Sequence, residues 1–311
     1  MRRALTIDEA SFGPDHPNVA IRLNNLAGLL QTTNRLKEAE PMMRRALTID
    51  EASFGSKHSN VAGDLDSLAQ LLQATNRLGD AEPMMRRALA INEASFGSNH
   101  PNVARNLNNL AALLQAANRH EEAEPLIRRA VKIVESSFDT DHPYVATVLN
   151  NLATLLMATN RHNEAEPLLK RVVGIVEKAN GPNHPNVATG LNNLSQLLQA
   201  TNHLDKAEPL IRRAIAIDES SFGPDHPNVA IRLHNLVQLL NATNRLDEAE
   251  PLMKRELEIF LKFTKRTGHN HPHLKVAAGS YVTLLVEMGN SKDQARAKVI
   301  AMAPDLLKDI E

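Results

Sequence analysis

Histidine recurs at regular places along this chain of 311 residues, and few side chains offer as wide a choice of chemistry. The nine letters FGPDHPNVA stand at residues 12–20 and again at residues 222–230, with near-copies between them. A set of thirteen histidines could bind metal ions or transfer protons in catalysis. The same residues could equally mark the boundaries of structural elements, and their spacing distinguishes these interpretations.

The histidines follow a constant period. Equivalent histidines stand 42 residues apart, with one final step of 45 residues, at His16, His58, His100, His142, His184, His226 and His271. Neighbouring packed helices lie about 8–10 Å apart, whereas a zinc ion needs several ligands within about 2.0–2.3 Å. Single histidines on such a ladder cannot converge on one ion, so the spacing predicts helix caps. We expect no metal site, even at the clustered His269, His271 and His273.

The repeated unit has the apolar periodicity of two helices. Leucine and alanine recur at i, i+3, i+4 and i+7 in residues 23–30, and a second stripe covers residues 36–47. Between the stripes lies an asparagine, which tolerates the left-handed conformation of a helix C-terminal turn. These asparagines are Asn34, Asn76, Asn118, Asn160, Asn202 and Asn244. Each unit is therefore predicted to be a helical hairpin.

The connection between successive hairpins follows from residue types. Phe12 closes a second helix, Gly13 supplies a left-handed exit, and Pro14 blocks continuation of the helix. Either Asp15 or His16 then caps the next helix, and the following proline fits its first turn, where a missing N–H costs nothing. We expect the Phe12 ring to pack into the hairpin junction.

Composition excludes several classes of function. The chain has 35 basic and 36 acidic residues, so it offers no basic field for nucleic acid or for an anionic membrane. It has no cysteine, and no apolar run approaches the length of a membrane span. A phosphate-binding glycine loop and an HExxH motif are both absent, and its carboxylates recur with the repeat. We expect a soluble cytoplasmic protein with no catalytic residues and no cofactor.

The repeated pattern resembles the tetratricopeptide repeat. A leucine–x–x–leucine–alanine motif occupies the first helix, and alanines with bulky apolar partners occupy the second. The 42-residue unit with HPNVA, LNNLA, NRLKEAEP and RRAL is similar to the kinesin-light-chain subtype, which is also common in bacterial proteins. The resemblance implies an all-α fold, a right-handed superhelical solenoid of antiparallel helical hairpins. No heptad segment accompanies the repeats, so it implies the architecture and not a motor role.

The period sets the expected boundaries. Residues 1–13 match residues 43–55 and form the second half of a repeat without a preceding cap, which predicts fraying or self-association through that end. A divergent capping hairpin and tail are expected at 269–311, where the sequence is polar and atypical. The hairpins between are expected at 14–55, 56–97, 98–139, 140–181, 182–223 and 224–268.

In the family that the chain resembles, first helices line a concave groove. Carboxamide side chains there can pair with the N–H and C=O groups of an extended peptide. The candidate peptide-binding residues form three rows: Asn24, Asn108, Asn150 and Asn192; Asn25, Asn109, Asn151, Asn193 and Asn235; and Gln31, Gln115 and Gln199. We favour ligand contact, with solvated side chains, for the Asn24 row. The Asn25 row fits ligand contact and bonding to the adjacent hairpin equally well.

Two further features carry charge. Glutamate precedes a basic residue by four positions in every second helix, as at Glu40 and Arg44, which predicts a solvated wall of ion pairs and no anion site. The second hairpin places Gly63, Asp64 and Asp66 where other repeats have larger or neutral groups. These substitutions form either a local specificity patch or neutral sequence drift in a tolerant groove, and we favour drift.

The sequence therefore predicts a scaffold or sensor module that binds a protein or an extended peptide and performs no chemistry. An alternative is a regulatory repeat fragment of a larger signalling ATPase or protease whose catalytic domain is absent here. A third alternative is a self-assembling filament.

Overall fold

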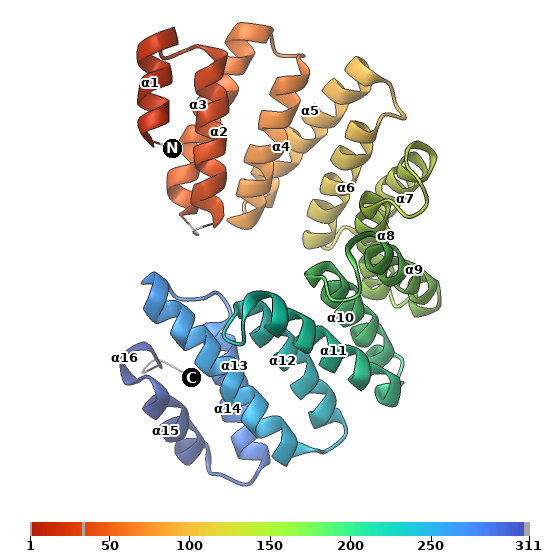
Figure 1. Ribbon diagram of the computed structural model, residues 1–311, viewed down its shortest axis with the longest axis vertical. Coiled ribbons are helices and arrows are strands. Elements are labelled where there is room, and N and C mark those ends of the chain that lie inside the picture. The colour runs from red at the N-terminus through yellow and green to blue at the C-terminus, as the bar shows by residue number, and fades with distance from the viewer. Residues whose placement is uncertain (1, 33–34, 308–311) are drawn as a thin grey trace. The chain divides into compact units, whose positions relative to one another are not determined.

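The computed structural model describes residues 2–32 and 35–307, and these residues form α-helices joined by short connections (Figure 1). They contain no β-strand. In chain order the helices are α1 (Arg2–Phe12), α2 (Pro17–Thr32), α3 (Leu36–Phe54), α4 (Ser59–Ala74), α5 (Leu78–Phe96), α6 (Pro101–Ala116), α7 (His120–Ser137), α8 (Pro143–Ala158), α9 (His162–Asn180), α10 (Pro185–Ala200), α11 (Leu204–Phe222), α12 (Pro227–Ala242), α13 (Leu246–Thr267), α14 (Leu274–Glu287), α15 (Lys292–Met302) and α16 (Pro304–Leu307).

The chain forms two compact units, Met1–Leu155 and Leu156–Glu311, and their boundary falls within α8. In the first unit α2 packs on α3, α4 on α5 and α6 on α7, and each pair also contacts the next one along the chain. In the second unit α10 packs on α11, α12 on α13 and α14 on α15 in the same way. The all-α architecture of consecutive packed helix pairs is therefore confirmed.

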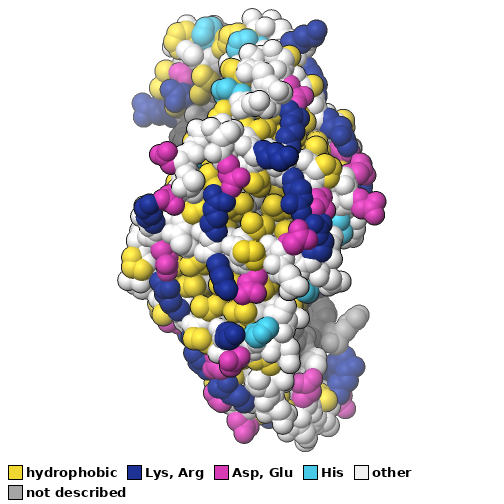
Figure 2. Space-filling model, turned by 90° about the vertical axis from the view of Figure 1, so that its right-hand side faces the viewer, with side chains coloured by type: hydrophobic (Ala, Val, Ile, Leu, Met, Phe, Trp, Pro, Cys, Tyr) yellow, Lys and Arg dark blue, Asp and Glu magenta, His cyan; other side chains and the backbone are white. Residues whose placement is uncertain are grey.

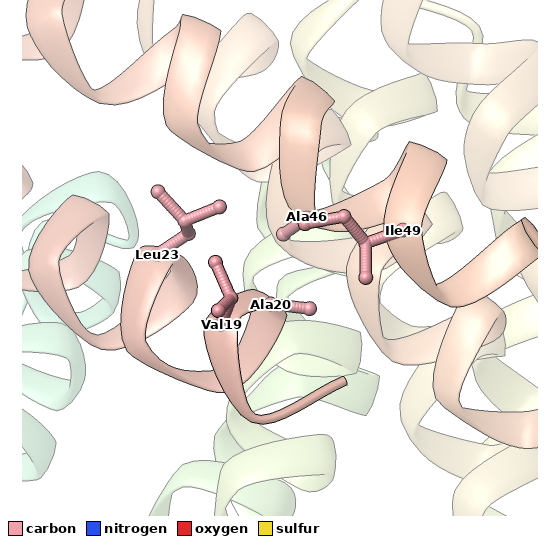
Figure 3. Close-up of a cluster of buried hydrophobic side chains, with 5 residues drawn as sticks. All are labelled: Val19, Ala20, Leu23, Ala46 and Ile49. Carbon is pink, nitrogen blue, oxygen red and sulfur yellow. The ribbon is translucent and has the colours of Figure 1, made fainter. Parts of the chain in front are cut away.

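Each hairpin buries its own apolar cluster. In the first hairpin Val19, Ala20 and Leu23 of α2 meet Ala46 and Ile49 of α3, all at most 2% exposed (Figure 3). Alanine at two of these positions lets the helix backbones approach closely, and full burial of a Val, Leu or Ile side chain contributes about 1.5–3 kcal/mol. The second hairpin repeats the cluster with the residues one period later.

Histidine caps the first helix of the hairpins. His58 has extended backbone dihedrals, and its Nδ1 accepts a hydrogen bond from the Asn60 backbone N–H at 3.2 Å. The same bond to the N–H two residues later occurs in five other connections, at His16, His100, His142, His184 and His226. An acceptor Nδ1 must carry a lone pair, so the capping form is the neutral ring with its proton on Nε2. The capping prediction is confirmed, with His16 and not Asp15 as the cap.

A phenylalanine ring stacks on five of these six histidines; at the sixth, His184, the equivalent position holds Asn180. The ring centroids of Phe12 and His16 lie 4.9 Å apart, and those of Phe96 and His100 lie 4.6 Å apart. Phe12 is nevertheless 53% exposed, so the expectation that its ring packs into the hairpin junction is wrong. The reason is local: Gly13 adopts φ 89°, which turns the chain back so that the histidine ring covers one face of Phe12 while the other face meets solvent.

The predicted asparagine turns are also present. A left-handed φ between 55° and 60° occurs at Asn76, Asn118, Asn160, Asn202 and Asn244. Asn34 lies outside the described residues. The last hairpin differs, because α14 begins at Leu274, and His271 accepts from the His273 N–H without starting a helix there.

Replacing His100 tests the cap. His100→Ala removes both the acceptor for the Asn102 N–H and the ring that stacks on Phe96, and loss of a cap costs about 0.5–2 kcal/mol. His100→Asn keeps a capping acceptor and is expected to recover most of that loss. Chemical denaturation followed by circular dichroism measures both variants. Equal destabilisation by alanine and asparagine would show that the stack and not the cap matters.

Candidate binding surface

The two asparagine rows bond to each other between neighbouring hairpins. The Asn108 side-chain oxygen accepts from the Asn151 amide at 2.8 Å, and that of Asn192 accepts from Asn235 at 2.6 Å. Asn108 is 8% exposed and Asn192 is 4% exposed. The expectation that side chains of the Asn24 row are solvated is therefore wrong for Asn108 and Asn192, because the hairpin that follows each of them covers it.

The remaining candidate residues lie in different settings. Asn24 donates to Asp64 at 2.6 Å, and Asn193 accepts from Asn192 at 3.3 Å. The Gln199 amide lies 3.3 Å from Ser195 Oγ, and Gln31 contacts the Met43 sulfur at 4.0 Å. Asn25 is exposed, whereas Asn109, Gln115 and Asn150 are half-buried. A role of these residues in peptide binding remains a prediction.

The predicted ion pairs form and extend between hairpins. Glu40 pairs with Arg44 four residues later, and the equivalent contact recurs at Glu82, Glu124, Glu166 and Glu208. Glu250 instead accepts from the Tyr281 hydroxyl of α14. Arg77, which precedes α5, also reaches back to Glu40 at 2.9 Å. The hydrogen bond from Arg44 makes the largest contribution to lowering the pKa of Glu40, and Arg77 lowers it further.

The second arginine of each doublet joins one hairpin to the one before it. Arg45 donates to the Pro14 carbonyl oxygen at 2.7 Å and pairs with Glu9 at the same distance. Equivalent contacts to a preceding carbonyl are made by Arg87, Arg129, Arg213 and Arg255. Figure 2 shows one face on which basic and acidic side chains are interspersed. The arginines are thus engaged within the fold, and the geometry does not favour an anion site.

One position joins the second helix of a hairpin to the first helix of the next, and we call it the junction position. It holds an ion pair of Asp8 with Arg22 at 2.6 Å and another of Asp218 with Arg232 at 3.3 Å. A third junction holds two amides, Asn92 and Asn106, bonded at 2.6 Å. The position varies in chemistry along the chain. The side chains of the first and third cases hydrogen-bond to each other, whereas at the second the oxygens of Asp218 form an ion pair with Arg232 but accept no hydrogen bond.

The junction between α3 and α4 holds two carboxyl groups. Asp50 and Asp64 are 5% and 4% exposed, and they lie close enough for Asp50 to raise the pKa of Asp64. Burial raises the pKa of Asp64 to about 7, with the charge of Asp50 adding to the effect and the bond from Asn24 opposing it. Burial also raises the pKa of Asp50 and of the neighbouring Asp66. Asp64 is therefore partly neutral near pH 7, where ordinary aspartates are charged.

These acids border a hollow of about 430 Å³ on the surface formed by α2, α4 and α6, which we call the acidic hollow. Its lining consists of Ile21, Asn24, Asp50, Asn60, Gly63, Asp64, Asp66, Ser67, Gln70 and Arg105. One buried oxygen of each of Asp50, Asp64 and Asp66, and the side-chain oxygen of Asn24, has no hydrogen-bond partner. The sequence had singled out Asp64 and Asp66 but not Asp50, which emerges only when the two sides of each junction are compared.

A smaller apolar pocket of about 90 Å³ lies in the second unit between α12, α13 and α14. His234 and the buried Glu256 pair across it at 3.2 Å, and this bond raises the pKa of His234. Among the described residues, no three His, Asp or Glu side chains lie where they could hold a metal ion. None of the described helices is both long and apolar enough to cross a membrane.

The sequence model of the tetratricopeptide repeat matches residues 1–52, 61–136, 107–177, 144–220 and 204–262. The chain belongs to the tetratricopeptide repeat family. No curated protein matches it. The solved structures similar to this tetratricopeptide repeat chain include nearly identical TPR-like repeats from a Podosopora anserina protein designated a kinesin light chain. That structure is 25% identical, with a TM-score of 0.56, over 67% of this chain and 98% of the other.

Two further structures share the fold. BtubC (BKLC) from P. vanneervenii is 21% identical with a TM-score of 0.58, over 82% of this chain and 94% of its own. A signal transduction ATPase with numerous domains from Pyrococcus horikoshii, which carries a tetratricopeptide repeat sensor, is 12% identical with a TM-score of 0.63. That match covers 94% of this chain and 44% of the ATPase. The architecture resembling kinesin-light-chain repeats is thereby confirmed.

The bond between the asparagine rows predicts a stability effect. Asn151→Ala removes the donor to Asn108 and leaves a buried oxygen unpaired, which costs about 1–3 kcal/mol. Asn25→Ala changes an exposed side chain in the same row and is expected to stay within about 0.5 kcal/mol of the unaltered protein. Urea denaturation of both variants measures the difference. Equally small effects would contradict the structural role of the Asn151 contact.

The raised pKa of Asp64 predicts a pH dependence. Between its ordinary pKa of 3.8 and about 7 the folded state binds more protons at Asp64 than the unfolded state. The stability contributed there is present below pH 4 and is lost as the pH rises toward 7. Asp64→Asn removes this titration, so its melting temperature should fall less than that of the unaltered protein from pH 5 to pH 8.

The exposed Asp80 gives a matched control, because Asp80→Asn makes the same change of charge outside the hollow. The control should retain the full decline in melting temperature. Protonation of the capping histidines is common to all three proteins and cancels in the comparison. Parallel pH profiles for Asp64→Asn and the control would refute the assignment.

Proposed function

We propose that this chain is a module that binds a protein or an extended peptide on the surface of its first helices, and that it performs no chemistry of its own. Membership of the tetratricopeptide repeat family supports a binding scaffold. The observation that carries the proposal is the acidic hollow, where α2, α3 and α4 together present buried side-chain oxygens without hydrogen-bond partners. Such groups are costly when buried and unpaired, and a ligand with complementary donors satisfies them.

The position of the hollow suits an extended ligand. Its lining comes from α2, α4 and α6, the first helices of three successive hairpins, and from Asp50 of α3. An extended peptide rises about 3.3 Å per residue, so a segment of several residues would cross all three helices. In this arrangement the exposed Asn25 and the half-buried Gln31 would contact the peptide, while the Asn108–Asn151 bond holds the hairpins in register.

A sensor role within a larger signalling protein is the second candidate. The observation that favours it is the similarity to the ATPase with a tetratricopeptide repeat sensor, over 94% of this chain. In that case the same surface would receive the ligand, and binding would be transmitted to a catalytic domain elsewhere. Both candidates share the requirement that the first helices bind a ligand.

Blocking the hollow tests this requirement. Gly63 lies on α4 at the wall of the hollow, and a Cβ added there would meet no atom within 4 Å, so Gly63→Gln places its side chain at the hollow from an unobstructed start. Gly79→Gln is the matched control, because it adds the same side chain in open space on the second helix of the same hairpin. Both changes replace a helical glycine and should slightly stabilise the fold.

Peptides selected from a random twelve-residue display library on the unaltered protein are the probe. We expect Gly63→Gln to weaken their binding at least tenfold and Gly79→Gln to leave it unchanged, as measured by fluorescence anisotropy. The proposal fails if no binding peptide is recovered, or if the selected peptides bind Gly63→Gln as tightly as the unaltered protein.

A further inference from the structure

The junction between α3 and α4 lacks a positive charge that equivalent junctions possess. At the same two positions Asp8 faces Arg22 and Asp218 faces Arg232, so an aspartate is paired with a guanidinium. Asp50 is the corresponding aspartate here, but its partner position holds Asp64, a second acid. The contact therefore has two carboxyl groups where the other two junctions have one carboxylate and one cation.

The groups around this pair do not replace the missing cation. Arg105 of α6 lies 3.7 Å from Asp66 and is half exposed, so it offsets the charge of Asp66. Glu51 of α3 adds a further negative charge near Asp64. His58 at the start of α4 lowers the pKa of Asp50, but burial has the larger effect and raises it. Asn24 of α2 supplies one neutral hydrogen bond to Asp64. The pair is left with a deficit of positive charge.

The unpaired oxygens lie at the wall of an accessible hollow. Asp50, Asp64 and Asp66 are each at least 95% buried, and each has one oxygen without a partner. All three line the acidic hollow, which opens to solvent and is wide enough for a side chain to enter. A buried carboxylate gains most from a charged donor, because such hydrogen bonds are shorter and stronger than neutral ones.

We propose that the acidic hollow binds a cationic side chain of the peptide ligand, a lysine ammonium or an arginine guanidinium, between Asp50 and Asp64. This specificity rests on the proposed function of the first-helix surface. When the hollow is empty, burial keeps a proton on Asp64 in part of the molecules near pH 7. When the cation enters, that proton leaves to solvent and the ligand takes the place that an arginine occupies at the equivalent junctions.

The location explains why two acids persist at a buried contact. Removing one of them is expected to stabilise the empty protein at neutral pH, since the electrostatic cost of the pair disappears. A cost that is offset only in the bound state is typical of a binding site. The neutral pair Asn92 and Asn106, at the next junction along the chain, shows that the fold accepts an uncharged solution at this position.

Three nine-residue peptides serve as probes: Ac-SGSGKGSGS-NH2, and the same peptide with norleucine or with glutamate in place of the lysine. Norleucine keeps the length of the side chain but removes its charge. Binding is measured at pH 8 and pH 5 by titration followed by NMR chemical shifts, a method that quantifies millimolar dissociation constants. The proteins compared are the unaltered chain, Asp64→Asn, Asp50→Asn and the control Asp80→Asn.

At pH 8 we expect the lysine peptide to bind about tenfold more tightly than the norleucine peptide, as hydrogen bonds to charged groups imply. The glutamate peptide should bind more weakly than both. The preference for lysine should disappear in Asp64→Asn and Asp50→Asn, persist in Asp80→Asn, and shrink at pH 5, where Asp64 is protonated. Calorimetry at pH 7 in buffers of different ionisation enthalpy should show release of a proton on binding.

The inference is overturned if the lysine peptide shows no binding at millimolar concentration, binds no more tightly than the norleucine peptide, or keeps its preference in both Asp64→Asn and Asp50→Asn. These results leave the wider function testable by itself. Library peptides that bind through Gly63 but show no preference for a basic residue would refute the cation site and retain the peptide-binding surface.

Discussion

Stacking of each hairpin on the next is the interaction on which the rest of this structure depends. A single hairpin buries a cluster such as Val19, Leu23 and Ile49, but the outer faces of its helices stay apolar until a neighbour covers them. Polar contacts also join neighbouring hairpins. Arg45 donates to the Pro14 carbonyl oxygen of the preceding connection, and Asn151 donates to Asn108 of the preceding hairpin. Stability in such an array is a sum of similar interfaces, so one interface can depart from the pattern without loss of the fold.

The histidines show how a reactive residue type can serve a purely local purpose. Each capping ring accepts one backbone hydrogen bond, and all but His184 stack on a phenylalanine, as His100 does on Phe96. This use requires the neutral ring, and burial lowers the pKa of His226, which favours that form. Repetition of an identical bond in successive connections keeps the start of every first helix at an equivalent place, which gives neighbouring hairpins a common register.

Charge is arranged differently on the wall and at the junctions. On the wall, carboxylates such as Glu40 and Glu82 each meet two arginines, and arginine lowers the pKa of both acids. At the junction of α3 and α4, burial raises the pKa of Asp50 and Asp64, and no base lies between them. The wall carboxylates are thus paired with arginines and stabilise the stacking of hairpins. The carboxyl groups of the acidic hollow lack such a cation, and a ligand can supply one.

The sequence by itself determined the repeat, the two helices of each unit, the histidine caps and the left-handed asparagines, because all of these depend on residues close together in the chain. It also indicated the family and singled out Asp64 and Asp66. Tertiary structure alone decided what lies across each interface. The Asn108–Asn151 bond, the reach of Arg77 to Glu40 and the pairing of Asp50 with Asp64 join different hairpins. Their existence depends on the angle and offset at which hairpins stack, and a periodic sequence does not specify which of its equivalent rows will meet.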